Sequence, residues 1–138
     1  MVDQIFVNLP VKDLTKTMEF WKKIGFSFNP QFTDDKAACL ILGRNIFAML
    51  LLEKYFSVFN PNKGIADTKK STEVLTALHF ESRAKVDEIV RKAVAAGGAT
   101  YKDPDVHGDW MYGHGFEDPD HHRWEVFHMD ESKMPKNP

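Results

Sequence analysis

The chain has one cysteine, no long apolar run and no signal-like start. Cys39 has no second cysteine in the chain to pair with, and it lies in the apolar run 37–42, which predicts a buried strand and a structural thiol. No apolar stretch approaches the roughly 18 residues needed to span a bilayer. Residues 1–4 lack the basic region and apolar run of a signal peptide. We therefore expect a cytoplasmic protein that does not contact the membrane.

An excess of positive charge is also missing. The 18 Lys and Arg residues are balanced by 20 Asp and Glu residues, which leaves a formal net charge of −2. Nucleic-acid binding normally requires a basic surface that neutralises phosphates, so we expect no nucleic-acid partner. Glycine-rich phosphate loops, nucleophile elbows, zinc-binding spacings and dinucleotide fingerprints are absent as well. These absences exclude the common nucleotide-binding and serine-hydrolase classes.

The first half of the sequence predicts a strand, a helix and three further strands. A strand is expected over 5–11, and a helix follows that Asp13 can cap and Gly25 can end. Short apolar runs at 26–28, 38–42 and 46–52 then predict three strands. The order is therefore βαβββ.

The second half repeats this order. A strand is expected over 74–80, followed by a helix between Ser82 and Gly97 and by strands near 99–102, 111–116 and 123–127. The helix ends Gly25 and Gly97 lie about seventy residues apart, which indicates a repeated architecture. The fold class is thus α+β: two βαβββ modules that form a pair of curved sheets, or half-barrels, around a cleft. We expect one domain over 1–138, with module one at about 3–55, a linker at about 56–73 and module two at about 74–130.

Three stretches resemble the vicinal oxygen chelate superfamily, which includes glyoxalases, bleomycin resistance proteins and extradiol dioxygenases. They are 8–26, which contains Val11-Lys12-Asp13-Leu14, then 86–98, and 116–125, which contains Asp118-Pro119-Asp120 and Trp124-Glu125. Residues 29–34, 74–75 and 129–130 are similar to a subgroup described as lactoylglutathione-lyase-related. The resemblance implies a small-molecule cavity. It also implies a homodimer, since members commonly pair and isologous dimers are the most frequent oligomers.

The resemblance also implies positions for metal ligands. Metalloenzymes of the superfamily hold one divalent ion with His, Gln or Glu side chains, at positions that correspond here to Phe6, Met49, Leu75 and Glu125. Phenyl and isobutyl groups cannot ligate, and a thioether is a poor ligand for a hard divalent ion. Only Glu125 matches, so we predict no cofactor; a divalent metal bound through other residues stays the alternative.

Glu125 and His79 are the candidate catalytic residues. Strand alternation places Glu125 on the face opposite Trp124, where a cavity would desolvate its carboxyl group and suit it to proton transfer. The alternative is a carboxylate paired with Arg123 or another cation. His79 could act with Glu125 as an acid–base pair, although a strand histidine is more often hydrogen-bonded in place.

The expected cavity is predominantly apolar. Its predicted lining residues are Phe6, Asn8, Met49, Leu51, Leu75, Trp110 and Tyr112. Trp110 and Tyr112 belong to a glycine-rich segment that could form a lid or an ordinary connection. Tyr55, Phe56 and Phe59 bring three rings to the start of the linker, at the cleft rim or against a second subunit. The alternative is that these side chains fill the core completely.

Two functions follow from these observations. The first is a metal-free glyoxalase- or bleomycin-resistance-like protein that binds a small hydrophobic molecule, and the apolar residues at the ligand positions favour it. The second is a divalent-metal-dependent lyase or dioxygenase that acts on a small carbonyl or vicinal-oxygen compound, with Glu125 as base or ligand. A scaffold role would require that no cavity exists.

Overall fold

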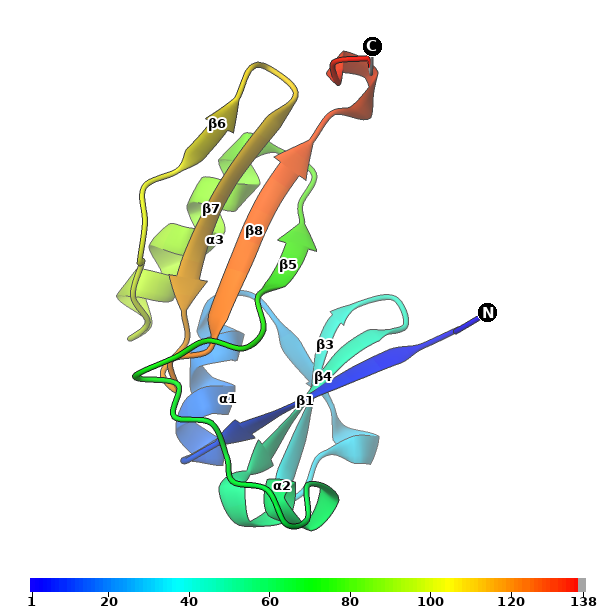
Figure 1. Cartoon of the computed structure of the whole chain (residues 1–138), viewed down its shortest axis with the longest axis vertical. Coiled ribbons are helices and arrows are strands. Elements are labelled where there is room, and N and C mark those ends of the chain that lie inside the picture. The colour runs from blue at the N-terminus through cyan, green and yellow to red at the C-terminus, as the bar shows by residue number, and fades with distance from the viewer. Residues whose placement is uncertain (137–138) are drawn as a thin grey trace. The chain divides into compact units, whose positions relative to one another are not determined.

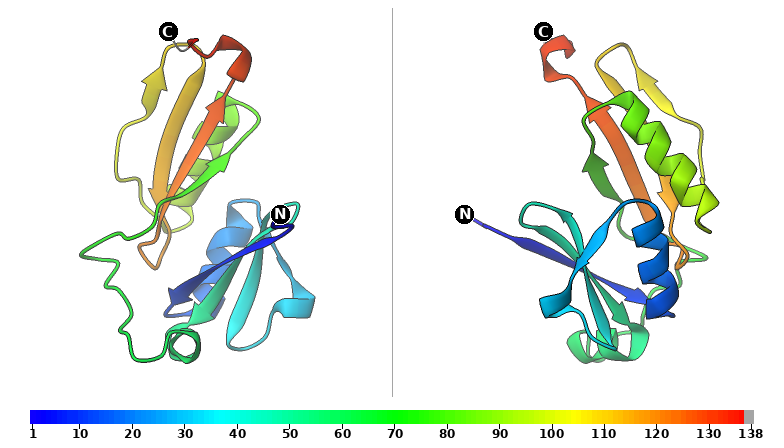
Figure 2. Two further views of the ribbon diagram at one scale, coloured as in Figure 1. Left: turned by 45° about the vertical axis from the view of Figure 1, so that its right-hand side comes forward. Right: turned by 180° about the vertical axis from the view of Figure 1, so that it is seen from behind.

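A computed structural model describes residues 1–136 of the chain. The chain divides into two compact units, Met1–Asp67 and Thr68–Pro138. Each unit is built on a four-stranded sheet with a helix packed on one face (Figure 1, Figure 2). Within the described part of the chain, no helix has the length and apolar character needed to cross a bilayer.

The first unit has the strand order β1-β4-β3-β2. Strand β1 runs parallel to β4, whereas the β4/β3 and β3/β2 pairs are antiparallel. Its elements are β1 (Ile5–Val11), α1 (Leu14–Lys23), β2 (Ser27–Asn29), a 3-10 turn (Pro30–Phe32), β3 (Ala37–Gly43), β4 (Ile46–Leu52) and α2 (Glu53–Phe59).

The second unit repeats this arrangement, with the order β5-β8-β7-β6 and β5 parallel to β8. Its elements are β5 (Thr76–His79), α3 (Arg83–Ala95), β6 (Asp105–His107), β7 (Met111–Glu117), β8 (Arg123–Met129) and a 3-10 turn (Glu131–Lys133). The same chain order and the same sheet order in both units confirm the predicted α+β fold with two βαβββ modules.

The predicted helix ends have the expected geometry. The side chain of Asp13 accepts a hydrogen bond from the backbone of Lys16 at 3.0 Å, and Ser82 does the same for Lys85 at 3.1 Å. Gly25 and Gly97 have φ angles of 102° and 107°, which a residue with a side chain rarely adopts. Local sequence signals therefore fix both helices.

The core of each unit lies between its helix and its sheet. Helix α1 buries Phe20 and Trp21 in the first unit, while α3 buries Val86 and Ile89 in the second. Cys39 is also wholly buried, and burial raises the pKa of its thiol, as expected for a structural cysteine. The sheet faces turned away from α1 and α3 therefore carry the candidate functional residues.

One predicted strand was wrong. Residues 99–102 do not form a strand, because only Ala99 makes a single bridge, to Glu117. The hydroxyl of Thr100 donates to the carbonyl of Gly115 at 3.1 Å, so side-chain bonds replace the backbone ladder there. The edge strand instead comes later in the chain, at β6.

Candidate functional site

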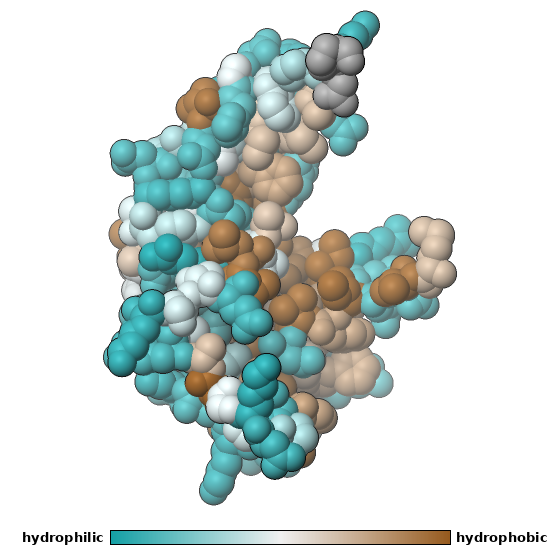
Figure 3. Space-filling model, viewed as in Figure 1, coloured by the Kyte–Doolittle hydropathy of each residue, from teal (hydrophilic) through white to brown (hydrophobic). Residues whose placement is uncertain are grey.

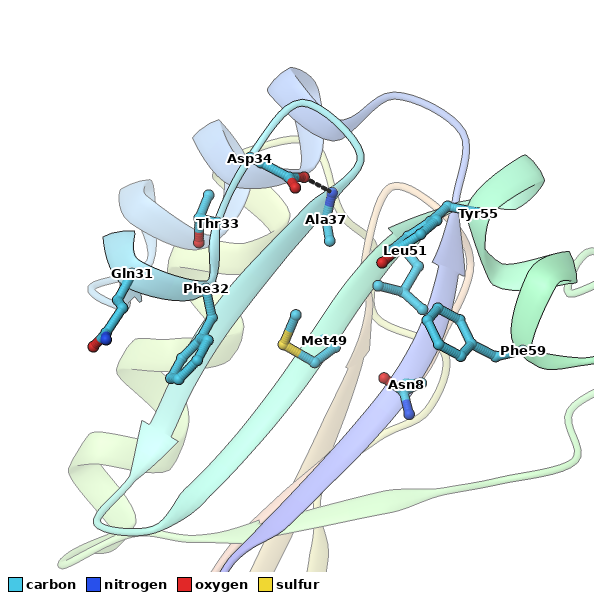
Figure 4. Close-up of a pocket in the computed structure, with 10 residues that line it drawn as sticks. All are labelled: Asn8, Gln31, Phe32, Thr33, Asp34, Ala37, Met49, Leu51, Tyr55 and Phe59. Atoms are coloured by element: carbon cyan, nitrogen blue, oxygen red, sulfur yellow. Dashed lines mark hydrogen bonds between the residues drawn. The ribbon is translucent and has the colours of Figure 1, made fainter.

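The first unit contains a pocket of about 280 Å³ on the sheet face turned away from α1 (Figure 4). Its lining residues come from β1, β3, β4, α2 and the turn after β2. They are Asn8, Gln31, Phe32, Thr33, Asp34, Ala37, Met49, Leu51, Tyr55 and Phe59. A cavity of this size suits a small organic molecule.

Strand pairing sets the floor of the pocket. Asn8 of β1 lies opposite Met49 of β4, and Leu51 of β4 lies opposite Ala37 of β3. Because side chains alternate along a strand, these four residues share one face, whereas Leu50 and Ala48 are buried on the other. The floor is therefore apolar at Met49 and Leu51, with an adaptable thioether at Met49 and one amide at Asn8.

Aromatic rings form the walls. Helix α2 follows β4 directly and carries Tyr55 and Phe59 one helical turn apart, so both rings lie on the same side of the helix. Their centroids are 5.1 Å apart and their planes meet at 83°, an edge-to-face contact. Phe32, from the 3-10 turn, lies on the other side of Met49 (Figure 4).

The turn after β2 supplies the polar part of the lining. The hydroxyl of Thr33 donates to the carbonyl of Asn29 at 2.7 Å and accepts from the backbone of Cys39 at 3.0 Å. Oδ1 of Asp34 accepts from the backbone N–H groups of Lys36 and Ala37 at 2.8 and 3.0 Å. The bond from Lys36 is the main cause that lowers the pKa of Asp34, so this carboxylate is ionised at neutral pH.

Three of the predicted pocket residues, Asn8, Met49 and Leu51, line this pocket. Phe6 is 39% exposed and stacks on Phe47 with ring centroids 4.8 Å apart. Figure 3 shows that apolar side chains gather over the first unit, and the exposed ones in β1 and β4 include Ile5 and Ile46. The apolar surface of the first unit thus extends beyond the pocket.

The other predicted pocket residues belong to the second unit. Leu75 precedes β5 and is 56% exposed. The hydroxyl of Tyr112 donates to Asp87 of α3 at 2.5 Å, and the guanidinium of Arg83 lies 5.5 Å from the centre of its ring. Burial and the bond to Asp87 raise the pKa of Tyr112 to about 12.

Trp110 lies just before β7, with its ring 6.2 Å from that of His107. Its carbonyl accepts from the backbone of Asp130 at 2.7 Å. Tyr112 is tied to the helix side of its sheet by α3. The lid proposed for this segment stays a prediction.

Glu125 lies on the sheet face of the second unit turned away from α3, and both of its oxygens have partners. Oε1 accepts from the ammonium of Lys102 at 2.7 Å, and Oε2 accepts from the hydroxyl of Tyr101. Lys102 also donates to Asp105 at 2.6 Å. Burial lowers the pKa of Lys102, but the bonds to Asp105 and Glu125 outweigh this effect and raise it. Glu125 is therefore held in an ion pair with a lysine of its own unit.

The sequence suggested Arg123 as the cation that pairs with Glu125, but Arg123 bonds a different carboxylate. It bonds Glu117 at 3.3 Å and stacks over Tyr101, with 4.3 Å between the guanidinium and the ring centre. Burial and Glu125 together raise the pKa of Tyr101 well above its usual value. The hydroxyl of Tyr101 therefore stays protonated and donates to Glu125.

Gly115 gives Tyr101 room to reach Glu125. A Cβ atom at Gly115 would lie 2.6 Å from Cζ of Tyr101 and 2.7 Å from Oε2 of Glu125, closer than van der Waals contact allows. At Gly113, two residues earlier in the same strand, the nearest atoms would be 3.8 Å away. The close approach is therefore specific to Gly115.

We expect G115A to lower the free energy of unfolding by about 1 to 3 kcal/mol, because the added methyl displaces the Tyr101 ring. The matched control is G113A, which adds the same methyl in ordinary contact and should change stability by less than about 0.5 kcal/mol. Urea unfolding measures both values. Equal stabilities for the two variants would contradict the close approach.

His79 bonds the backbone at the far end of β8. Its Nε2 accepts from the backbone N–H of Met129 at 3.2 Å, and its ring lies edge-on to Phe127 at 5.2 Å. Glu125 bonds Tyr101 and Lys102 instead. An acid–base pair of His79 and Glu125 is thus a prediction without a hydrogen bond to support it.

Several lining residues were missed from the sequence. Tyr55 and Phe59 had been placed at a rim or an interface, and the structure puts both in the pocket wall. The turn residues Gln31 to Asp34 had no assigned role. Asn29 caps the turn by accepting from the backbone of Gln31 at 2.9 Å, and Pro30 begins it, so Asn-Pro was the available signal.

Comparison with known families finds a match over residues 3–126 to the Glyoxalase/Bleomycin resistance protein/Dioxygenase superfamily. The chain belongs to this superfamily, and the match includes most of both βαβββ modules. Comparison with curated proteins finds no match.

Solved structures show the same fold. A hypothetical protein from S. aureus is 30% identical, with 92% of this chain and 94% of that chain covered and a TM-score of 0.76. A glyoxalase-related enzyme from Fulvimarina pelagi is 20% identical, with 92% and 88% covered and a TM-score of 0.74. A glyoxalase/bleomycin resistance protein/dioxygenase family enzyme from Burkholderia phytofirmans is 17% identical, with 91% and 97% covered and a TM-score of 0.73.

Two equivalent strand positions bear on the divalent ion of the superfamily's metalloenzymes. Glu125 is already paired with Lys102 and bonded by Tyr101, and the equivalent position in the first sheet is Met49. Asn8 and Ala77 each lie five residues before the N-cap of the following helix, Asp13 or Ser82. Met49 and Glu125 are their strand partners and are therefore equivalent. Within residues 1–136, no group of three or more His, Cys, Asp or Glu side chains is arranged to hold a metal.

Proposed function

We propose that this protein binds a small, largely apolar organic molecule in the first-unit pocket and does so without a metal ion. The observation that carries the proposal is the pocket of about 280 Å³, with three aromatic rings around a Met and Leu floor. Burial of an apolar ligand against such side chains supplies binding free energy of roughly 25 cal/mol per Å². Membership of the superfamily supports the binding of a small molecule, because the superfamily includes proteins named for resistance to one, bleomycin.

The environment of Glu125 supports the metal-free part of the proposal. A divalent ion at this carboxylate would have to displace the Lys102 ammonium, which lies 2.7 Å from Oε1, and the Tyr101 hydroxyl. It would also approach a positive charge that Asp105 holds in place at 2.6 Å. Like charges at this separation repel, so the ion pair opposes metal binding.

Two measurements test the proposal. N-phenyl-1-naphthylamine, a neutral fluorescent probe, should bind with increased fluorescence. At ten times its Kd it should add about 1.4 kcal/mol of stability and raise the melting temperature by about 4 °C. Nickel, zinc, manganese and EDTA should leave the melting temperature unchanged, and the purified protein should contain no stoichiometric metal.

A different result would contradict each part of the proposal. Stoichiometric metal with a clear rise in melting temperature would overturn the metal-free site and favour a lyase or dioxygenase. Absence of probe binding would overturn the pocket as a ligand site. K102M serves as a control for the pocket, because it changes the second unit and leaves the first unit intact. The substitutions in the pocket wall are considered in the Discussion.

A further inference from the structure

The pocket lining has one charged side chain. Among the described lining residues only Asp34 carries a charge, and the others with polar groups are neutral: Asn8, Gln31, Thr33 and Tyr55. Oδ1 of Asp34 is fixed by the backbone N–H groups of Lys36 and Ala37, so the carboxylate has a defined place at the pocket edge (Figure 4). Asp34 is exposed, so the open edge of the pocket presents a negative charge in a fixed position.

The aromatic walls add negative potential. The face of an aromatic ring attracts a cation, and Tyr55, Phe59 and Phe32 surround the apolar floor. The Tyr55 ring already has an ammonium group over it, since Nζ of Lys36 lies 5.2 Å from its centre. An aromatic wall beside a carboxylate is the combination that binds ammonium groups in proteins.

We propose that the pocket selects a small organic cation, an amine or quaternary ammonium group carried on an apolar or aromatic body. This inference rests on the proposed function and adds the charge of the ligand. The cationic group would lie between the Asp34 carboxylate and the ring of Tyr55, with the apolar body over Met49 and Leu51. An anionic ligand would instead face the carboxylate and the ring faces, which repel it.

Lys36 does not prevent this arrangement. The Lys36 side chain is exposed and is not part of the lining. The contacts of an exposed cation add little to the stability of the fold, so their loss costs little free energy. Lys36 lies over the Tyr55 ring, and its charge also acts on the Asp34 carboxylate, so a ligand cation that meets both groups would take the place of the Lys36 ammonium. We therefore expect Lys36 to move toward solvent when the pocket is filled.

The test compares two probes of the same shape that differ in charge, phenyltrimethylammonium and tert-butylbenzene. Both are titrated against bound N-phenyl-1-naphthylamine at 0.15 M salt, where the field of distant surface charges is screened. The cation should bind about tenfold more tightly than the neutral probe, as the cation–π and carboxylate contributions together imply.

The critical variant is D34N. Its amide oxygen can still accept from the backbone of Lys36 and Ala37, so the turn is kept while the charge is lost. We expect the preference for the cation to fall to about threefold or less, with the affinity for tert-butylbenzene unchanged. The control D35N removes an exposed neighbouring carboxylate that does not line the pocket, and it should keep the full preference.

The outcomes separate the two proposals. Equal binding of both probes, or equal losses in D34N and D35N, would overturn the selection for a cation while leaving the pocket as a binding site. Failure of N-phenyl-1-naphthylamine and of both probes to bind would overturn the proposed function itself. A tenfold preference that D34N alone reduces supports the inference.

Discussion

Replacement of Asp118 by alanine is expected to lower the free energy of unfolding by about 3 kcal/mol at pH 7. Asp118 is 3% exposed and lies in the turn between β7 and β8. One carboxylate oxygen accepts from the backbones of Asp120 and His122 at 2.9 and 3.1 Å, and the other accepts from Nε1 of Trp124 at 3.0 Å. Alanine has no carboxylate, so these three donors would lose the acceptor that holds the turn between β7 and β8 together.

Urea unfolding followed by tryptophan fluorescence measures this loss. The matched control is D103A, which removes an exposed carboxylate from the same unit and should change stability by less than about 0.5 kcal/mol. A D118A variant as stable as D103A would show that the hairpin does not depend on this carboxyl group.

The loss in D118A should also depend on pH. Burial raises the pKa of Asp118 to about 6 from an ordinary value of 3.8, against the lowering by His122 and Trp124. A raised folded-state pKa stabilises the fold fully below pH 3.8, and this contribution is lost as the pH rises to about 6. The stability difference between wild type and D118A should therefore grow as the pH is lowered from 7 to 4. A difference independent of pH would contradict the buried-carboxyl account.

The fold was predictable because its signals are local. Asp13 and Ser82 cap the helices through bonds that span three residues, and Gly25 and Gly97 end them with positive φ angles. The strand expected at 99–102 failed for the opposite reason. Thr100 there bonds Gly115, which lies 15 residues away and whose position only the folded sheet defines.

The candidate site was predictable only in part. Strand alternation identified Asn8, Met49 and Leu51, since parity is a local property. The turn that supplies Phe32 and Asp34 was missed, because its place over the sheet depends on the bond from Cys39 to Thr33. Sequence periodicity does not describe such a turn.

The partner of Glu125 also required the structure. Strand neighbours suggested Arg123, but Lys102, 23 residues earlier in the chain, holds the carboxylate. The space left by Gly115 brings Tyr101 to the same carboxylate. Catalytic roles for Glu125 and His79, the homodimer and the cytoplasmic location stay predictions.

Removal of both rings from the pocket wall should abolish most of the binding. In the variant Y55A/F59A, the affinity for N-phenyl-1-naphthylamine is expected to fall by about 30- to 160-fold, because each lost ring contact is worth about 1 to 1.5 kcal/mol. Phe59 is 63% exposed, so its removal should cost the fold little. Fluorescence titration measures the affinity, and urea unfolding checks the fold.

The matched control for these rings is F6A/F47A. This variant removes another contacting aromatic pair from the same unit, with centroids 4.8 Å apart, and neither ring lines the pocket. It should keep the wild-type affinity for the probe if binding occurs between α2 and the floor at Met49. Loss of affinity in F6A/F47A with wild-type affinity in Y55A/F59A would instead place the probe on the exposed surface of β1 and β4. Because the two variants remove similar aromatic area, the comparison separates a pocket from a merely apolar surface.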